Sequence, residues 1–464
     1  MSERPTLDGL LPEGPAAVAG LGKSGEAAVA FLLAHGRPVL ACDDGSPTPV
    51  VERLEALIAQ GAPLTLRTGG LPAKELTTCG AILLSPGIRR DHPAIAEARG
   101  AGVEVINDVE LLHRWVRTHQ PEARFAAITG ANGKSTVTTL LGRMMEASGA
   151  VTRTGGNLGT PALALWDEAT RVYVLELSSF QLESVAGFRA EAAALLNLTP
   201  DHMDRYPTVA AYLAAKARVF ERQQAGDVAI LDGDDPQTLG PLAQRLAAGP
   251  ARWVPITARG GVAGGVGLEE GWLVDRREGA PRRILPLERI RMGGPRINAA
   301  SAAALAFGLG ASEAAVVEVL KQFPGLPHRV EHVRTLEGVG YYNDSKGTNV
   351  GATAQALASF DQGVVLIAGG RDKAGVFEPL RPLLAQRGAG LVLIGEAADK
   401  IGAALAGAVP TQRAGSLIEA VEQARRLAPP GGVVLLSPAC ASFDMFRNFE
   451  DRGEQFREAV HGLA

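Results

Sequence analysis

The sequence of 464 residues has few cysteines, few aromatic side chains and no strong excess of charge of either sign. Its three cysteines, Cys42, Cys79 and Cys440, are odd in number and far apart, which argues against a disulfide framework and against a zinc pattern. A net charge of −4 gives no reason to expect a nucleic acid partner or binding at a membrane surface. We therefore expect an ordinary globular protein in a reducing compartment, the cytoplasm.

Long apolar runs are also missing. No stretch approaches the roughly 20 apolar residues that span a bilayer, so we expect no membrane insertion. The N-terminal segment Met1–Pro5 lacks the charged-then-apolar pattern of a signal peptide. At roughly 100–200 residues per domain, the length predicts about three domains. We expect the protein to be a monomer.

Lysine is scarce, since only eight of the 46 basic residues are lysine and the others are arginine. Arginine therefore serves the solvated surface, and each lysine is a candidate for a task that needs a compact ammonium with an adjustable pKa. Five of the eight lie in glycine-rich or polar motifs: Lys23, Lys134, Lys216, Lys346 and Lys373.

The segment Gly-Ala-Asn-Gly-Lys-Ser-Thr at 130–136 lies between an apolar strand pattern at 125–128 and a helix pattern at 137–145. A glycine-rich turn in this context points several backbone N–H groups at one spot, and the helix N-terminus adds partial positive charge. Lys134 can bind the outer phosphates and the Ser135 hydroxyl can ligate Mg²⁺. The spacing is shorter than that of the usual P-loop, and the alternative is a glycine turn with a chance Lys-Ser pair. We favour a nucleoside triphosphate site.

Residues 1–118 alternate strand and helix patterns. Strands are expected at 15–19, 38–42 and 81–84. This is a doubly wound arrangement, whose ligands bind at the carboxyl ends of the strands. Gly20-x-Gly22-x-x-Gly25 with Asp43 downstream fits a dinucleotide fingerprint, but a tight turn without a ligand is also compatible. NAD is one possible ligand, and we favour another diphosphate-bearing nucleotide.

Residues 119–326 carry the triphosphate motif and a second βα series. A buried strand at 172–177 bears one acid, Glu176, whereas the part from 227 to 292 gives no motif and is interpreted as irregular βα elements. Leu326–Arg329 resembles a linker. Beyond it, strands at 364–368, 391–394 and 433–436 with helices between them predict a third α/β domain.

Two places in the sequence carry candidate metal ligands. Glu176 follows the triphosphate motif by about forty residues, and a P-loop ATPase needs such an acid to hold Mg²⁺ beside the triphosphate. The alternative is an exposed glutamate at a strand end. The segment 197–205 concentrates His202 and two acids on a loop, which suits either metal binding or a surface turn.

Lys216 lies within the apolar stripe of a helix expected at 209–220. Val209, Leu213, Lys216 and Phe220 follow the spacing of one helix face. Burial disfavours the ammonium and lowers its pKa, and a neutral amine can react with CO₂ to form an anionic carbamate suited to a place beside Mg²⁺. From the helix alone, a lysine that extends to the surface is the favoured alternative.

Three polar or glycine-rich loops follow expected strands of the third domain. They are 343–349, 369–373 and 437–446. Because the carboxyl ends of parallel strands meet at one edge of a sheet, these loops imply one cleft.

In this order, the motifs resemble those of the Mur ligase family over nearly the whole chain, and most closely those of the members that add D-glutamate. The segments that carry the resemblance are 129–136, 156–159, 175–182, 201–204, 326–329, 343–346 and 437–442. The resemblance implies a Rossmann-like domain for a UDP-sugar (1–118), a P-loop ATPase-like domain (119–326) and a Rossmann-like α/β domain that admits the amino acid (327–464).

The resemblance also implies an ATP-dependent ligase that joins D-glutamate to UDP-N-acetylmuramoyl-L-alanine in peptidoglycan precursor synthesis. An acyl phosphate would be the intermediate, ADP and phosphate the products, and two Mg²⁺ ions the cofactors. One ion would be held by Ser135 and Glu176, the other by His202 and carbamylated Lys216, and Lys134 would join Glu176, His202 and Lys216 in catalysis.

The resemblance implies further binding residues. ATP would be bound by Gly130, Asn132, Gly133, Lys134, Ser135, Thr136, Asn298, Arg329, Asp344 and Lys346. The UDP-sugar would be bound by Gly22, Ser24, Asp43, Asp44, Ser85, Asn157 and His202, and D-glutamate by Thr348, Lys373, Ser442 and Phe443.

Three rival functions remain open. A sibling ligase would add another amino acid to a related UDP-sugar. A folylpolyglutamate synthase would share the ATP core, although the N-terminal UDP-type domain argues against it. A nucleotide sensor would bind ATP without catalysis.

Overall fold

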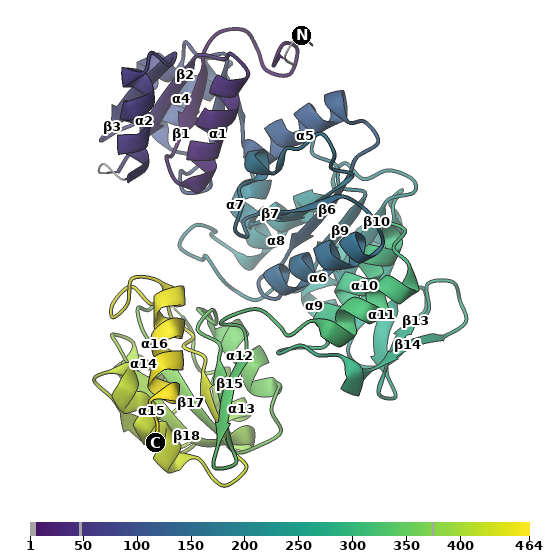
Figure 1. Cartoon of the computed structure of the whole chain (residues 1–464), viewed down its shortest axis with the longest axis vertical. Helices are drawn as coiled ribbons and strands as arrows, with labels where there is room; N and C mark the ends of the chain where they lie inside the picture. The colour runs from purple at the N-terminus through teal and green to yellow at the C-terminus, as the bar shows by residue number, and fades with distance from the viewer. Residues whose placement is uncertain (1–5, 46–48, 374) are drawn as a thin grey trace.

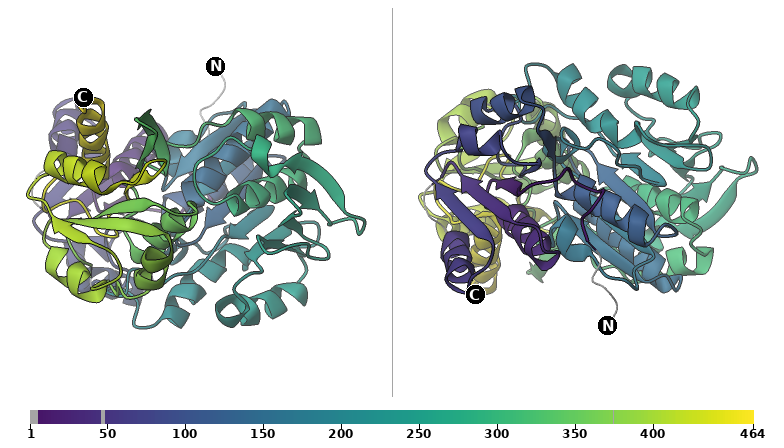
Figure 2. Two further views of the ribbon diagram at one scale, coloured as in Figure 1. Left: turned by 90° about the horizontal axis from the view of Figure 1, so that it is seen from below. Right: turned by 90° about the horizontal axis from the view of Figure 1, so that it is seen from above.

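In a computed structural model, the chain forms three α/β units, each built on its own sheet (Figure 1). The structure describes residues 6–45, 49–373 and 375–464, so the Met1–Pro5 segment considered for a signal peptide lies outside the described residues. The N- and C-terminal units lie on the same side of the central unit in Figures 1 and 2. The expected α/β class is confirmed.

The N-terminal sheet has five parallel strands in the order β3-β2-β1-β4-β5. Its strands are β1 (Ala16–Ala19), β2 (Val39–Asp43), β3 (Leu64–Thr68), β4 (Ala81–Leu84) and β5 (Glu104–Ile106). Its helices are α1 (Lys23–Ala34), α2 (Pro49–Ala59), α3 (Ala73–Leu76) and α4 (Pro93–Gly100). Buried alanine and leucine side chains on both faces of β1 and β4 are typical of a parallel sheet covered on both sides.

The central sheet has nine strands in the order β14-β13-β12-β11-β10-β9-β6-β8-β7. Its strands are β6 (Arg124–Thr129), β7 (Thr152–Gly156), β8 (Val172–Glu176), β9 (Ala192–Leu195), β10 (Val228–Asp232), β11 (Arg252–Thr257), β12 (Val266–Glu269), β13 (Trp272–Asp275) and β14 (Arg282–Pro286). Its helices are α6 (Lys134–Ala147), α7 (Ser179–Leu182), α8 (Val209–Ala217), α9 (Pro236–Ala247), α10 (Ile297–Gly308) and α11 (Glu313–Gln322), with 3-10 turns η1 (Ala162–Leu165), η2 (Arg218–Phe220) and η3 (Leu287–Arg289).

The interpretation of residues 227–292 as irregular βα elements is confirmed in part, because β10, α9 and β11 form a βαβ unit, but it is wrong for the strands that follow β11. β10, β11 and β12 continue the parallel sheet, and β13 and β14 follow β12 as antiparallel strands at its edge. Gly271, with a φ of 79°, allows the tight turn between β12 and β13. These strands are too short for their alternation to be recognised among the surrounding glycines and arginines.

The C-terminal sheet has six strands in the order β15-β16-β20-β17-β18-β19, and only the β15–β16 pair is antiparallel. Its strands are β15 (Glu331–Leu336), β16 (Val339–Asn343), β17 (Val364–Gly369), β18 (Gly388–Ile394), β19 (Thr411–Arg413) and β20 (Val433–Leu436). Its helices are α12 (Val350–Ala358), α13 (Leu380–Arg387), α14 (Ala398–Ala404), α15 (Leu417–Leu427) and α16 (Phe449–His461). The expected strands of the third domain are confirmed.

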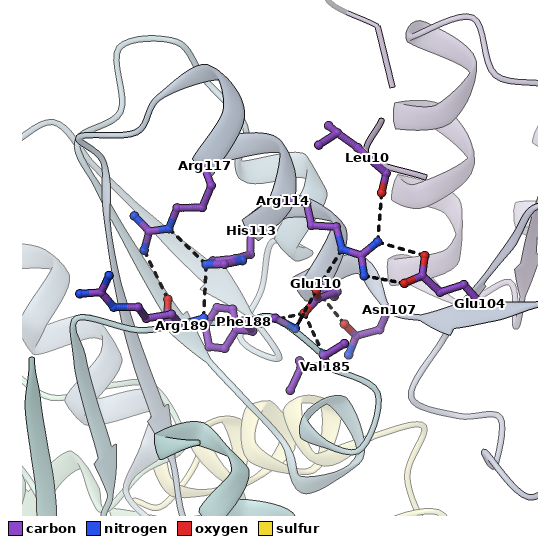
Figure 3. Close-up of polar contacts among 12 residues, drawn as sticks. Leu10, Glu104, Asn107, Glu110, His113, Arg114, Arg117, Val185, Phe188 and Arg189 are labelled. Carbon is purple, nitrogen blue, oxygen red and sulfur yellow. Dashed lines mark hydrogen bonds and ion pairs between the residues drawn. The ribbon is translucent and has the colours of Figure 1, made fainter. Parts of the chain in front are cut away.

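Helix α5 (Asp108–His119) connects the first two units. Figure 3 shows its polar side chains contacting both. Arg114 donates to the Glu104 carboxylate of β5 at 2.7 Å, and the buried Glu110 accepts backbone N–H groups from Ala186, Gly187 and Phe188 at about 3 Å. The two units are thereby fastened to one helix.

Candidate active site

The loop at 130–133 connects β6 to the N-terminus of α6, where the first N–H groups of a helix have no partner within the helix. Gly130 and Gly133 have φ values of 148° and 82°, which L side chains rarely adopt. A Cβ on Gly133 would lie 2.5 Å from the Asn298 side-chain oxygen of α10, so this glycine also permits a close approach. Asn197 fixes the loop from outside, because its side chain accepts from the Asn132 N–H at 2.8 Å and donates to the Asn132 carbonyl.

The Lys134 ammonium lies over this loop. It donates to the carbonyl oxygens of Gly130 and Ala131 at 3.0 and 2.9 Å. Burial lowers the pKa of Lys134, and the neighbouring Arg329 lowers it further, against the opposing charge of Glu176. A desolvated cation beside a glycine-rich helix N-terminus is suited to bind phosphate.

Glu176, at the end of β8, is 3% exposed, so the exposed strand-end alternative is wrong. Its carboxylate accepts from the Ser135 hydroxyl at 2.5 Å and from the Asn157 amide at 2.7 Å. Burial alone would raise the pKa of Glu176, but Lys134 and these two hydrogen bonds outweigh burial and lower it. Arg329 donates to the Ser135 hydroxyl at 2.7 Å across the boundary between the central and C-terminal units.

His202 lies on the loop between β9 and α8, and its ring packs 4.8 Å from that of Phe180. Burial lowers the pKa of His202, as do Lys373 and Lys216, whereas Asp201 opposes them. The neutral imidazole that results has a free lone pair, which is the form that binds metal ions. Asn349 of the C-terminal unit donates to Asp201 at 3.2 Å.

Lys216 is 2% exposed, so it does not extend to the surface. Its ammonium donates to the Gly130 carbonyl at 2.9 Å and lies 4.6 Å from the centre of the Tyr212 ring. Burial lowers the pKa of Lys216 well below its usual range, and Lys134 adds to this shift. A lysine buried in this way loses its proton more readily than an exposed lysine.

Asn298, Asp344 and Lys346 surround the outer side of the loop. They line one pocket with Asn132 and Thr136. Burial raises the pKa of Asp344 to about 7, although the Ser437 hydroxyl donates to its carboxylate at 2.7 Å. Burial also lowers the pKa of Lys346 to about 8.

A cavity of about 670 Å³, here called the central cavity, joins all three units. It is lined from the N-terminal unit by Lys23, Ser24 and Pro86, from the central unit by Lys134, Ser135, Asn157, Glu176 and His202, and from the C-terminal unit by Arg329, Lys346, Thr348 and Lys373. Two of the three loops predicted to share one cleft, 343–349 and 369–373, therefore line this cavity, whereas no residue of the loop 437–446 does.

Other predicted residues lie outside the walls of this cavity. Asp43 accepts from the N–H groups of Leu21 and Gly45, and Asp44 contacts His92 at 3.2 Å. Ser85 donates to the Gly20 carbonyl at 2.6 Å. These three residues and Gly22 lie at the carboxyl edge of the N-terminal sheet.

The last two residues predicted to bind D-glutamate also lie outside the walls of the central cavity. Ser442 and Phe443 are adjacent, but the first is 2% and the second 63% exposed, and neither lines the central cavity. Their loop follows β20, where Arg452 of α16 donates to the Cys440 carbonyl at 3.2 Å and to Ser345.

Sequence reasoning missed Gln181, Asn349 and Phe449, which also line the central cavity. Asn349 caps α12 by accepting from the Ala352 N–H at 2.8 Å, and this cap pattern was available in the sequence. Nothing local identifies Phe449, whose ring lies 3.6 Å from the Lys346 ammonium, because that contact is between residues distant in sequence.

Family models match all three units. That of the Mur ligase MurD-like N-terminal domain matches residues 15–107, that of the Mur ligase middle domain 128–248, and that of the Mur ligase glutamate ligase domain 328–440. In the part of the chain that the structure describes, no helix is long and apolar enough to cross a membrane.

The chain is 41% identical over 452 residues to a protein of Geobacter metallireducens named UDP-N-acetylmuramoylalanine–D-glutamate ligase, with 96% of this chain and 97% of that protein covered. A protein of the same name from Marinobacter nauticus is 42% identical over 451 residues, covering 96% and 98%. Among solved structures, MurF from Thermotoga maritima in complex with ADP matches with a TM-score of 0.59 at 15% identity, covering 98% of this chain and 96% of that chain. The chain therefore belongs to the Mur ligase family.

Proposed function

We propose that the protein joins D-glutamate to UDP-N-acetylmuramoyl-L-alanine with ATP, releasing ADP and phosphate in peptidoglycan precursor synthesis. The observation that carries this proposal is the similarity to D-glutamate ligases, 41% identity over 96% of the chain. The central cavity supports it, because the loop at 130–136 and loops of all three units meet there. Lys134 and Lys346, whose pKa values burial lowers, also line this cavity. We assign the UDP-sugar to 1–118, ATP to 119–326 and the amino acid to 327–464.

The chemistry follows from the substrate carboxylate, which is an anion without a good leaving group and resists attack by an amine. We propose that one of its oxygens attacks the γ-phosphorus of ATP, so that ADP leaves and an acyl phosphate forms. The D-glutamate amine then attacks the acyl carbon, and the tetrahedral intermediate loses phosphate. Lys134 and the α6 N-terminus offset the charge of the crowded anions in the first step.

Mg²⁺ would supply charge neutralisation and orient the phosphates. The Ser135 hydroxyl and the Glu176 carboxylate, 2.5 Å apart, are the hard oxygen ligands that this ion prefers. The described residues include no cluster of three or more histidine, cysteine, aspartate or glutamate ligands. Mg²⁺ usually keeps several waters and binds through one or two carboxylates plus phosphates, so this donor set fits.

We assign the second ion to His202 and Lys216. Lys216 as an ammonium would repel a cation, whereas its carbamate would attract one. The buried amine with its lowered pKa supports carbamylation, because only the neutral amine reacts with CO₂.

We assign the nucleotide to the pocket lined by Asn298, Arg329, Asp344 and Lys346 together with the loop at 130–136. Thr348 and Lys373 on the central cavity would contact D-glutamate, with Ser442 and Phe443 nearby on the β20 loop. The UDP-sugar would extend from Gly22, Ser24, Asp43, Asp44 and Ser85 of the N-terminal sheet to Asn157 and His202. We expect the reaction to occur in the cytoplasm, where ATP is supplied, with the protein as a monomer.

The test is phosphate release by the purified protein with ATP, Mg²⁺ and UDP-N-acetylmuramoyl-L-alanine. D-glutamate, L-alanine and a diamino acid are supplied in separate reactions, each is repeated with related UDP-sugars in place of this substrate, and a further reaction contains a folate and L-glutamate. We expect release only with D-glutamate. Release with another amino acid would identify a sibling ligase, release with a folate and L-glutamate a folylpolyglutamate synthase, and no release with any of them a nucleotide sensor.

A further inference from the structure

Arg205 joins the loop after β4, which lines the central cavity at Pro86, to the segment that follows α7. Its guanidinium donates to the Pro86 carbonyl at 3.1 Å and to the Glu183 carboxylate at 2.6 Å. Pro86 follows β4 in the N-terminal unit, whereas Glu183 follows α7 in the central unit. The Arg205 side chain is only 11% exposed, so these contacts are partly shielded from water, where charge-assisted hydrogen bonds are strong.

The same guanidinium connects to His202 through an aromatic ring. It lies 3.9 Å from the centre of the Phe180 ring, and that ring packs at 60° and 4.8 Å against the His202 imidazole. Arg205 therefore fixes one face of Phe180 while His202 contacts the ring. Cation–π contacts of a desolvated arginine are favourable and directional.

The backbone of His202 needs such support. Its φ of 58° is in the left-handed region, which is costly for a residue other than glycine. The His202 carbonyl accepts from the N–H groups of Arg205 and Tyr206 at 2.9 and 3.0 Å, and the Tyr206 hydroxyl donates to Glu183. Arg205, Tyr206 and Glu183 thus hold His202 in a conformation that the chain would not adopt alone.

We propose that Arg205 is a positioning residue that sets the sugar-nucleotide loop at Pro86 and the His202 imidazole in one mutual geometry. Pro86 and His202 both line the central cavity, whereas Arg205 does not, so it acts through its neighbours and not by contact with substrate. This inference rests on the proposed function, in which His202 and the Ser85–Gly87 loop bind the UDP-sugar.

The test compares Arg205→Ala and Arg205→Lys with the wild type in the phosphate-release assay. For Arg205→Ala we expect the KM for UDP-N-acetylmuramoyl-L-alanine to rise about tenfold or more, because a buried charge-assisted bond is lost, and kcat to fall as well. The KM for ATP should change less than about twofold. Added guanidinium ion should restore part of the activity of Arg205→Ala but not of Arg205→Lys, whose ammonium occupies the space.

Arg89→Ala is the matched control, since Arg89 and Arg205 line one pocket that is separate from the central cavity, but the Arg89 side chain is half exposed and its ion pair is with Asp91. We expect its kinetics to equal those of the wild type. If Arg205→Ala does not fold, Glu183→Gln carries the test, with the same selective rise in the KM for the UDP-sugar.

Two outcomes would overturn the inference: unchanged UDP-sugar KM and kcat in Arg205→Ala, or an equal loss for both substrates without rescue by guanidinium, which would indicate a general structural role. Absence of D-glutamate-dependent phosphate release in the wild type would instead overturn the proposed function. The two failures are therefore separated by the wild-type measurement.

Discussion

The central unit contacts its two neighbours in different ways. Toward the N-terminal unit, one continuous apolar cluster runs from Leu7 through Trp115 to Leu246. Trp115 of α5 packs against Phe31 of α1 at 5.2 Å and against Trp166 at 5.8 Å, so aromatic side chains cross the boundary. Such an interface resembles the interior of a single domain more than a contact between domains.

Toward the C-terminal unit, the described contacts are polar. Arg329 donates to Ser135, and Asn349 donates to Asp201 and to Asn132. The two apolar clusters of the C-terminal sheet contain no described residue before Val330. Interfaces that are small and polar permit relative motion of domains.

The difference between the apolar and the polar boundary indicates that the two have different roles in the proposed reaction. In the proposed function, the N-terminal and central units form one platform that presets the UDP-sugar against the phosphate loop. The C-terminal unit is joined mainly through residues proposed to bind substrates, so the ligands themselves complete that boundary. Closure there would exclude water from an acyl phosphate, which hydrolyses readily.

The comparison predicts that changes in the central cavity, which faces the C-terminal boundary, lower turnover and leave stability nearly unchanged. Lys134→Ala should lower turnover by about 10³-fold or more, because it removes the cation that stabilises the transferred phosphoryl group. The melting temperature should shift by less than about 2 °C, since the hydrogen bonds of the ammonium are to two carbonyl groups of its own loop, and the loss of its attraction to Glu176 is offset by relief of its repulsion from Arg329. Phosphate release and calorimetry measure the two effects. Near-normal turnover would refute the phosphate role.

Changes at the N-terminal boundary should have the opposite effect. Glu110→Gln should lower the free energy of unfolding by about 3 kcal/mol, because the buried carboxylate accepts three backbone N–H groups and pairs with Arg114. Urea unfolding at pH 7 measures this, with Glu146→Gln, an exposed position on α6, as the control. Equal stability of the two variants would show that α5 does not fasten the units. At 25 °C, kcat should stay within about twofold of the wild type.

A third variant tests the second Mg²⁺ site, which we propose at His202 and Lys216. Lys216→Ala should lower activity about thirtyfold at saturating Mg²⁺, in the range typical of lost support for a metal site. Acetate or formate should restore part of the activity by replacing the carbamate. Lys321→Ala, on the distant helix α11, should behave as the wild type. Full activity of Lys216→Ala without additive would count against a metal-supporting role.

The smallest expected effect concerns Asp108, at the start of α5. Burial raises its pKa to about 6, so the folded protein disfavours the ionised carboxyl. An aspartate that titrates lower when unfolded makes stability fall as pH rises from about 4 to about 6, after which the loss is constant. Asp108→Asn should therefore be more stable than the wild type by about 2 kcal/mol at pH 7.5 and gain nothing at pH 4. An advantage that is the same at both pH values would be inconsistent with this titration.

Local patterns predicted the parts of the site that depend on short-range geometry. The loop at 130–136 was recognisable because its glycines, lysine and helix start are adjacent in sequence. The apolar stripe of its helix raised the burial of Lys216 as a hypothesis, but from the helix alone a lysine extending to the surface was favoured. Its contact with Gly130 joins residues 86 positions apart and has no local signal. For the same reason, Arg205 was part of a recognised motif while its role between Pro86 and Phe180 was not predictable.

The sequence also did not predict which loop residues are buried and which are exposed. Ser442 and Phe443 belong to one motif, yet the loop after β20 turns one inward and the other outward. The antiparallel edge β12–β14 was missed because strands of four or five residues carry too few alternating positions.

The most direct test of the proposed acyl phosphate traces an oxygen atom of the substrate carboxyl group into the released phosphate. UDP-N-acetylmuramoyl-L-alanine labelled with ¹⁸O in its terminal carboxyl group is converted with ATP and D-glutamate, and the released phosphate is analysed by mass spectrometry. If that carboxylate attacks ATP to form an acyl phosphate, each phosphate released carries one carboxyl oxygen and is labelled. Unlabelled phosphate formed together with the D-glutamyl product would contradict the account.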